Sequence, residues 1–180
     1  MRGDAMARAR KQECLDRERG RGVDEIFQGN ALNTVDAKGR LSVPAFIRSV
    51  LDRSSDRRSV YVGLHESKPC LTFYGAAYSS FLIGDLDRRR DGLEKRDADP
   101  NEIEELEAGL FGMGEPVGYD QGGRIVLPQM HRGLAQIRDA VLFISRGRFV
   151  EGWNPKLCLD LGGDNRKRIA GYYLEQGAKR

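Results

Sequence analysis

Residues 35–44 read "VDAKGRLSVP", and residues 119–128 repeat the pattern as "YDQGGRIVLP". Aspartate, glycine, arginine and proline recur at the same four positions, and apolar residues lie between arginine and proline in both copies. A charged turn that occurs twice with the same residues at the same spacing indicates an internal duplication. The chain is therefore expected to fold from two related halves.

The duplication extends beyond the two turns. Each proline suits the start of a short helix, over 45–53 and 129–137, because its missing N–H would be unpaired there. Two runs rich in β-branched and aromatic residues then follow in each half, which is typical of strands. These runs are 59–64 and 70–74 in the first half and 140–145 and 148–153 in the second. The sequence of each half therefore predicts the same order of elements: strand, turn, strand, short helix, strand, strand.

One such half is too small to bury both faces of its hairpins. The two halves are therefore expected to pack into one α+β unit, a pseudo-symmetric β-barrel with short flanking helices. The tail is expected to be disordered, because it is rich in arginine and glycine and has no apolar periodicity. The predicted organisation is a basic tail (1–24), a first half (26–75), a helical connector (76–114), a second half (115–160) and a C-terminal helix (161–180).

The connector carries its own helix signals. Asp99 is a candidate N-cap, and Pro100 suits the first helical position after it. Ile103, Leu106 and Leu110 follow at the spacing of one buried stripe. We expect this stripe to belong to the core, with a solvated acidic face opposite.

Composition excludes several classes of function. The net charge of +3 resides in residues 1–22, and the two repeat regions, 33–64 and 117–153, are only mildly basic around an acidic stretch at 85–107. Bulk charge therefore gives no argument for nucleic acid, and only local clustering can. No apolar run approaches the roughly 18 residues of a membrane helix, and the N-terminus has no apolar signal region. A cytoplasmic protein without membrane partners is expected.

The sequence offers no catalytic or metal-binding constellation. Cys14, Cys70 and Cys158 are far apart and form no C-x-x-C pair. His65 and His131 are expected at the surface, without a neighbouring nucleophile or metal partner. We therefore expect no enzyme activity, no catalytic residue, no metal and no cofactor.

Four residues of the repeated motif are expected to shape its turns. Asp36 and Asp120 suit the first position of a tight turn, where a carboxylate accepts backbone N–H groups. Gly39 and Gly123 suit the left-handed residue that leads the chain into the next strand.

Three basic residues of the motif are not required by turn geometry. Lys38, Arg40 and Arg124 stand at the mouth of a rigid hairpin, where a long cation can reach a phosphate or a guanine edge. The alternative is a solvated turn in which each arginine pairs with the aspartate four residues earlier and binds nothing. The duplication favours a binding role, but spacing alone leaves both interpretations open.

The motifs resemble a known family. "DAKGRLSVP" is similar to the D-x-K-G-R-x-x-x-P signature of the MraZ proteins, bacterial transcriptional regulators linked to the division and cell-wall gene cluster. The similarity includes "FQGNALNTV", where Phe27 and Gly29 match an F-x-G opening, and the second motif with the hairpin "AVLFISRGRFVEGW". It covers roughly residues 26–160.

The resemblance implies a fold and a function. The fold would be a pair of AbrB-type swapped-hairpin half-barrels within one chain. The function would be binding of double-stranded promoter DNA at short direct repeats by a ring-shaped homo-oligomer, usually as a repressor, on the nucleoid in the cytoplasm. Matched by position, Lys38, Arg40 and Arg124 correspond to the DNA-facing residues, and Asp36 and Asp120 to the family's acids.

The second turn departs from the pattern, because Gly122 stands where the first turn has Lys38. The first turn is therefore expected to dominate contact with DNA. About three motif cations per chain would neutralise few phosphates and bind weakly at physiological salt. A ring that presents the turns along repeated sites would raise affinity by roughly 10²–10⁴ through effective concentration.

Two other binding functions remain open. One is a ring-forming scaffold with protein partners, in which the arginine turns make only intersubunit ion pairs. The other is an antitoxin-like regulator of the same hairpin fold, although such regulators usually carry one motif per chain and dimerise. Salt-dependent binding to promoter DNA separates the scaffold from a DNA-binding regulator.

Overall fold

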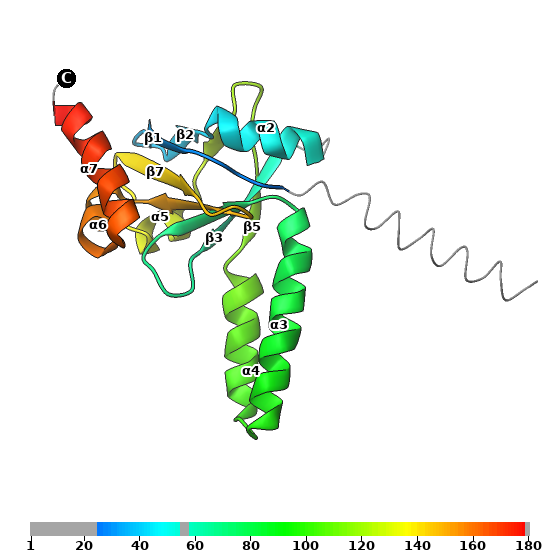
Figure 1. Ribbon diagram of the computed structural model, residues 1–180. Helices are drawn as coiled ribbons and strands as arrows, with labels where there is room; N and C mark the ends of the chain where they lie inside the picture. Colours follow the sequence, from blue (N-terminus) through cyan, green and yellow to red (C-terminus); the bar gives the residue numbers. More distant parts are fainter. Residues whose placement is uncertain (1–24, 55–57, 179–180) are drawn as a thin grey trace, which may run out of the picture.

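The computed structural model describes residues 25–54 and 58–178 of the chain (Figure 1). The predicted disordered tail lies outside the described residues. The described part combines a mainly antiparallel sheet with several helices, so the α+β class is confirmed. No helix within it has the length and hydropathy that crossing a membrane requires.

The main sheet has six strands in the order β1-β7-β8-β4-β3-β5, and all neighbours are antiparallel. The strands are β1 (Asn30–Thr34), β7 (Ala140–Ser145), β8 (Val150–Trp153), β4 (Leu71–Tyr74), β3 (Ser59–Leu64) and β5 (Glu115–Gly118). Strand β1 of the first half pairs with β7 of the second, and β5 of the second half pairs with β3 of the first. Each half therefore contributes its first strand to the hairpin of the other.

A second sheet contains only β2 (Arg40–Ser42) and β6 (Arg124–Val126), the strands that follow the two charged turns. The Val43 N–H donates to Gly123 O at 2.8 Å, and the Leu127 N–H donates to Gly39 O at 2.9 Å. These two bonds are equivalent, and each half donates one of them. We call β2 and β6 with their two turns, residues 36–42 and 120–126, the ribbon.

The predicted single barrel is not what the described strands form. The six-stranded ladder ends at β1 on one side and at β5 on the other, and the ribbon is a separate sheet. Strand β2 has only three residues and pairs with β6, so it does not continue the ladder from β1. The turn at Asp36 redirects the chain between β1 and β2, and its counterpart at Asp120 does so between β5 and β6.

The ribbon packs onto the sheet through alternate residues. Leu41 and Ile125, the middle residues of β2 and β6, are buried, whereas the residues on either side of them are exposed. This is the period-two alternation of a half-buried strand. The same core cluster contains Val60, Phe73 and Phe143 of the main sheet. The outer face of the ribbon therefore points away from the core.

The short helices after the two prolines differ in burial. Helix α2 (Ala45–Ser54) buries Ile47, Val50 and Leu51. Helix α5 (Gln129–Leu134) is shorter, and its Met130 and Leu134 are each more than half exposed. The repeat thus predicts the positions of the two helices in the sequence but not how many of their apolar side chains are buried.

The connector forms a helical pair that projects from the sheets (Figure 1). It contains α3 (Ala77–Lys95), α4 (Pro100–Glu107) and the π-helix η1 (Ala108–Gly112). The predicted N-cap is confirmed, because Asp99 Oδ1 accepts the Asn101 N–H at 2.9 Å. Neither α3 nor α4 has a buried residue, and only Leu110 of the predicted stripe reaches the core. The expectation of a fully buried stripe was therefore wrong, since the pair extends beyond the sheet that would cover it.

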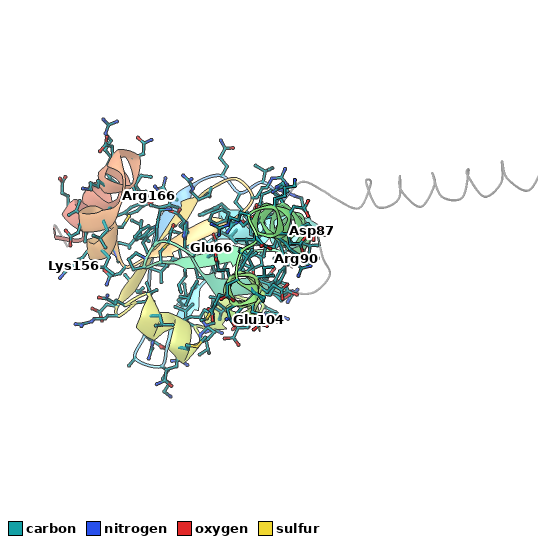
Figure 2. All side chains as sticks on the ribbon, turned by 90° about the horizontal axis from the view of Figure 1, so that it is seen from below. Glu66, Asp87, Arg90, Glu104, Lys156 and Arg166 are labelled. Atoms are coloured by element: carbon teal, nitrogen blue, oxygen red, sulfur yellow. The ribbon has the colours of Figure 1, made fainter. Side chains whose placement is uncertain are left out.

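The C-terminal region forms two helices, α6 (Pro155–Leu161) and α7 (Asp164–Ala178). A second core cluster joins them to the opposite face of the sheet through Leu142, Trp153, Cys158 and Ala170. Figure 2, viewed along α3 and α4, places Arg166 and Lys156 on the far side of the molecule from Asp87 and Arg90.

Candidate nucleic-acid interface

The first turn is held by the Asp36 carboxylate. Its Oδ1 accepts the backbone N–H groups of Lys38 and Arg40, both at 2.9 Å, and its carbonyl accepts the Gly39 N–H at 2.9 Å. Gly39 has φ of +79°, a left-handed conformation that residues with a Cβ rarely adopt. The structure therefore places both residues as the sequence predicts for a tight turn.

The second turn repeats these bonds. Asp120 Oδ1 accepts the N–H groups of Gly122 at 2.9 Å and Arg124 at 3.0 Å. The Gly123 N–H donates to the Asp120 carbonyl at 2.9 Å, and Gly123 has φ of +76°. The two turns thus share one backbone conformation although their sequences differ at the two positions after the aspartate.

Each motif arginine also pairs with its own aspartate. Arg40 Nε lies 2.6 Å from Asp36 Oδ2, and Arg124 Nε lies 2.8 Å from Asp120 Oδ2. The arginine side chains nevertheless remain 58% and 68% exposed. A guanidinium has five N–H donors, and the Nε bond uses one of them. The carboxylate therefore orients the arginine and leaves donors that face solvent.

The aspartates stay ionised at neutral pH. The backbone N–H and side chain of Arg40 lower the pKa of Asp36 below its ordinary value, and Arg124 lowers the pKa of Asp120 in the same way. Because hydrogen bonds to the charged form lower the pKa of an acid, the turn geometry is retained from neutral pH down into the acidic range.

The ribbon brings the two motif arginines onto one face. Arg40 is opposite Val126, and Ser42 is opposite Arg124, and all four residues are exposed. Arg40 and Arg124 are therefore diagonal neighbours, a relation in which Cα atoms lie about 7–8 Å apart. Lys38 is exposed at the end of the first turn. The sequence predicted the three cations separately, and the shared face of Arg40 and Arg124 follows from the pairing of β2 with β6.

Two further arginines approach the turns and were missed from the sequence. Arg48 of α2 packs against Gly123 in the second turn, and Arg132 of α5 packs against Gly39 in the first. Each stands four residues after the proline of its repeat, at Pro44 and Pro128. Extending the motif alignment by one helical turn would have revealed this pair.

The histidines differ from expectation. His131 is 1% exposed and its Nε2 lies 2.7 Å from Met113 O, so the surface location predicted for it was wrong. The short α5 turns this side chain inward against the segment before β5. His65 is half-buried. In the described ranges no three side chains among His, Cys, Asp and Glu gather closely enough to hold a metal ion.

Several curated relatives of this chain carry the name "Transcriptional regulator MraZ". The relative from Gluconacetobacter diazotrophicus is 33% identical over 72% of this chain and 79% of its own length. Those from Gluconobacter oxydans and Parvibaculum lavamentivorans are 32% and 31% identical, over 75% and 81% of this chain and 79% and 86% of their own lengths. No family model matches the chain.

These relatives place the chain among the transcription regulators, and their names describe regulation and not a catalysed reaction. The chain belongs to the MraZ family. The resemblance that the two motifs indicated is therefore confirmed at the level of the family.

Proposed function

We propose that this protein regulates transcription by binding double-stranded DNA with the outer face of its ribbon. The observation that carries the proposal is the exposed face on which Arg40 and Arg124 are diagonal neighbours, with Lys38 at the adjoining turn. A two-stranded ribbon fits into the major groove of B-DNA. An arginine there reads guanine through O6 and N7, and a lysine contacts either guanine or phosphate.

The aspartates support this role by positioning the arginines. A long side chain that is held before binding loses less conformational entropy when it binds. The Nε–carboxylate bonds of Arg40 and Arg124 restrain both guanidinium groups at the strand ends. Asp36, Gly39, Asp120 and Gly123 thus shape the turns, and Lys38, Arg40 and Arg124 contact DNA, with the first turn dominant.

The exchange of β1 and β5 between the hairpins of the two halves is consistent with AbrB-type swapped-hairpin half-barrels, with the domain limits predicted above. A chain with few motif cations gains affinity when several copies present their ribbons to direct repeats. We therefore propose a ring-shaped homo-oligomer on the nucleoid, in the cytoplasm. Its target is the promoter of the division and cell-wall cluster, and its effect is repression.

The test is a titration of the DNA upstream of the protein's own gene, followed by fluorescence anisotropy at salt concentrations between about 50 and 200 mM. The expected result is binding that weakens steeply with salt and that exceeds binding to a shuffled duplex. Equal affinity for both duplexes would refute sequence-specific regulation. Absence of binding by an intact oligomer would favour the scaffold function instead.

A further inference from the structure

Two arginines outside the motif cross between the halves of the molecule. Arg48 belongs to the helix of the first half, yet a Cβ atom on Gly123 of the second turn would collide with its Cδ and Nε atoms. Arg132 belongs to the helix of the second half, and a Cβ atom on Gly39 of the first turn would lie 2.9 Å from its Nη1. Each turn is therefore completed by an arginine from the other half.

Arg48 is held by a hydrogen bond to the backbone of its own half. Arg48 Nε donates to Val43 O at 3.1 Å, in a half-buried position at the edge of the ribbon. Within residues 25–54 and 58–178, neither Arg48 nor Arg132 forms an ion pair within 4.0 Å, whereas Arg40 and Arg124 each do. Asp52, one turn after Arg48 on α2, is hydrogen-bonded to the Tyr119 hydroxyl instead.

The result is a concentration of positive charge at each turn. The first turn has Lys38, Arg40 and Arg132, with Asp36 as the acid bonded there. The second has Arg124 and Arg48, with Asp120 as the bonded acid. Cations held close together repel one another, and a bound anion offsets this electrostatic repulsion.

We propose that Arg48 and Arg132 are DNA phosphate-binding residues, each forming with the turn of the opposite half a composite anion site at the rim of the ribbon. The inference rests on the proposed function, and it adds interactions with DNA that the motif does not contain. Both arginines come from helices beside the ribbon and not from its outer face, which suits a groove wall better than a base edge. Phosphate contacts fix the register of a protein on the duplex, and base contacts supply sequence preference.

The experiment compares R48Q and R132Q with the charge-retaining R48K and R132K and with R168Q, a control that removes an exposed arginine of α7. Affinity is measured across a salt series on two duplexes, the DNA upstream of the protein's own gene and an unrelated sequence of equal length. Each glutamine variant is expected to weaken binding to both duplexes by a similar factor. It should also reduce the slope of log affinity against log salt by roughly 0.9 for each phosphate that is no longer neutralised.

The lysine variants are expected to keep the wild-type slope, because a lysine also neutralises a phosphate. Thermal unfolding and size-exclusion chromatography establish that each variant is folded and assembled. A wild-type slope in both glutamine variants, or a change no larger than that of R168Q, would overturn the inference while leaving the proposed function standing. Failure of the unmodified protein to bind either duplex would overturn the proposed function itself.

Discussion

The two halves of this protein share one turn but differ in what that turn carries. The bonds that build the turns agree to within a few tenths of an ångström, from the N–H groups on Asp36 and Asp120 to the Nε–carboxylate pairs. The position directly before the left-handed glycine is Lys38 in the first turn and Gly122 in the second. The backbone of the turn therefore tolerates different residues at this position, and the two turns differ in side-chain charge and not in conformation.

The halves differ more in the helices that follow their last strands. In the first half α3 and α4 project from the sheet without burying a residue. In the second half α6 and α7 pack on the sheet, and Arg166 reaches the fully buried Glu151 through Nε at 2.6 Å and Nη2 at 2.7 Å. Trp153 Nε1 also donates to this carboxylate at 2.9 Å.

The largest effect is expected from breaking this buried pair with R166M. Removing one partner of a buried ion pair costs about 3–5 kcal/mol of folding free energy when the remaining charge is left uncompensated. We expect the lower end of this range, because Arg146 Nε remains 3.5 Å from Glu151 Oε1. Burial raises the pKa of Glu151, but hydrogen bonds from Arg166 and Trp153 outweigh it and hold the pKa below its ordinary value. Without Arg166 that pKa should rise, so the stability deficit should be largest at neutral pH and shrink in acid.

Chemical denaturation at two pH values measures this deficit. R168M, an exposed neighbour on α7, is the matched control and is expected to change stability by less than about 0.5 kcal/mol. The double variant E151Q/R166M removes both charges and should recover much of the loss. A deficit below about 1 kcal/mol in R166M would show that α7 is held by its apolar contacts alone.

The next effect is the loss of DNA binding in R40A. This variant removes the oriented guanidinium of the turn with more cations, and we expect promoter binding to be abolished, a loss of at least roughly 100-fold or about 2.7 kcal/mol. The proposed oligomer should stay intact in size-exclusion chromatography, because Arg40 pairs within its own chain. Unchanged affinity would contradict the DNA-binding role. Dissociation of the oligomer would instead assign Arg40 to an intersubunit interface.

The repeat allowed much of the fold and the geometry of the two turns to be predicted. The spacing of Asp36, Gly39 and Pro44, repeated 84 positions later, predicted two turns and the strands around them, because turn geometry depends on local residues. The α+β class and the capping role of Asp99 followed from equally local signals. The motif also indicated the MraZ family, which the curated relatives confirm.

What the sequence did not reveal depends on contacts between the halves. The diagonal placement of Arg40 and Arg124 arises from the pairing of β2 with β6, and the crossing of Arg48 onto Gly123 arises from the packing of α2 beside it. The burial of His131 likewise depends on the segment before β5. Periodicity along one segment carries no information on such partners.

The third effect is a smaller loss of DNA binding in R124A. Arg124 has the same bond to its aspartate as Arg40, but its turn lacks the lysine. We expect roughly a tenfold loss of affinity, about 1.4 kcal/mol, in the same titration. A loss equal to or larger than that of R40A would show that the two turns contribute alike despite their different charge.

The smallest effect tests the single cation that distinguishes the turns. K38G gives the first turn the residue of the second, and we expect only a several-fold loss of affinity, since one phosphate contact carries a small share of the total. G122K places a lysine where the first turn carries Lys38, beside an equivalent aspartate and in a residue that is not left-handed. A Cβ atom at Gly122 would lie 3.2 Å from Asp120 Oδ1, so this carboxylate has to shift by a few tenths of an ångström. The exchange variant K38G/G122K keeps the net charge and moves the cation to the second turn. If the lysine sets the ranking, R124A should then cost more than R40A in this background. If R40A still costs more, the dominance of the first turn comes from its position in the assembly and not from Lys38.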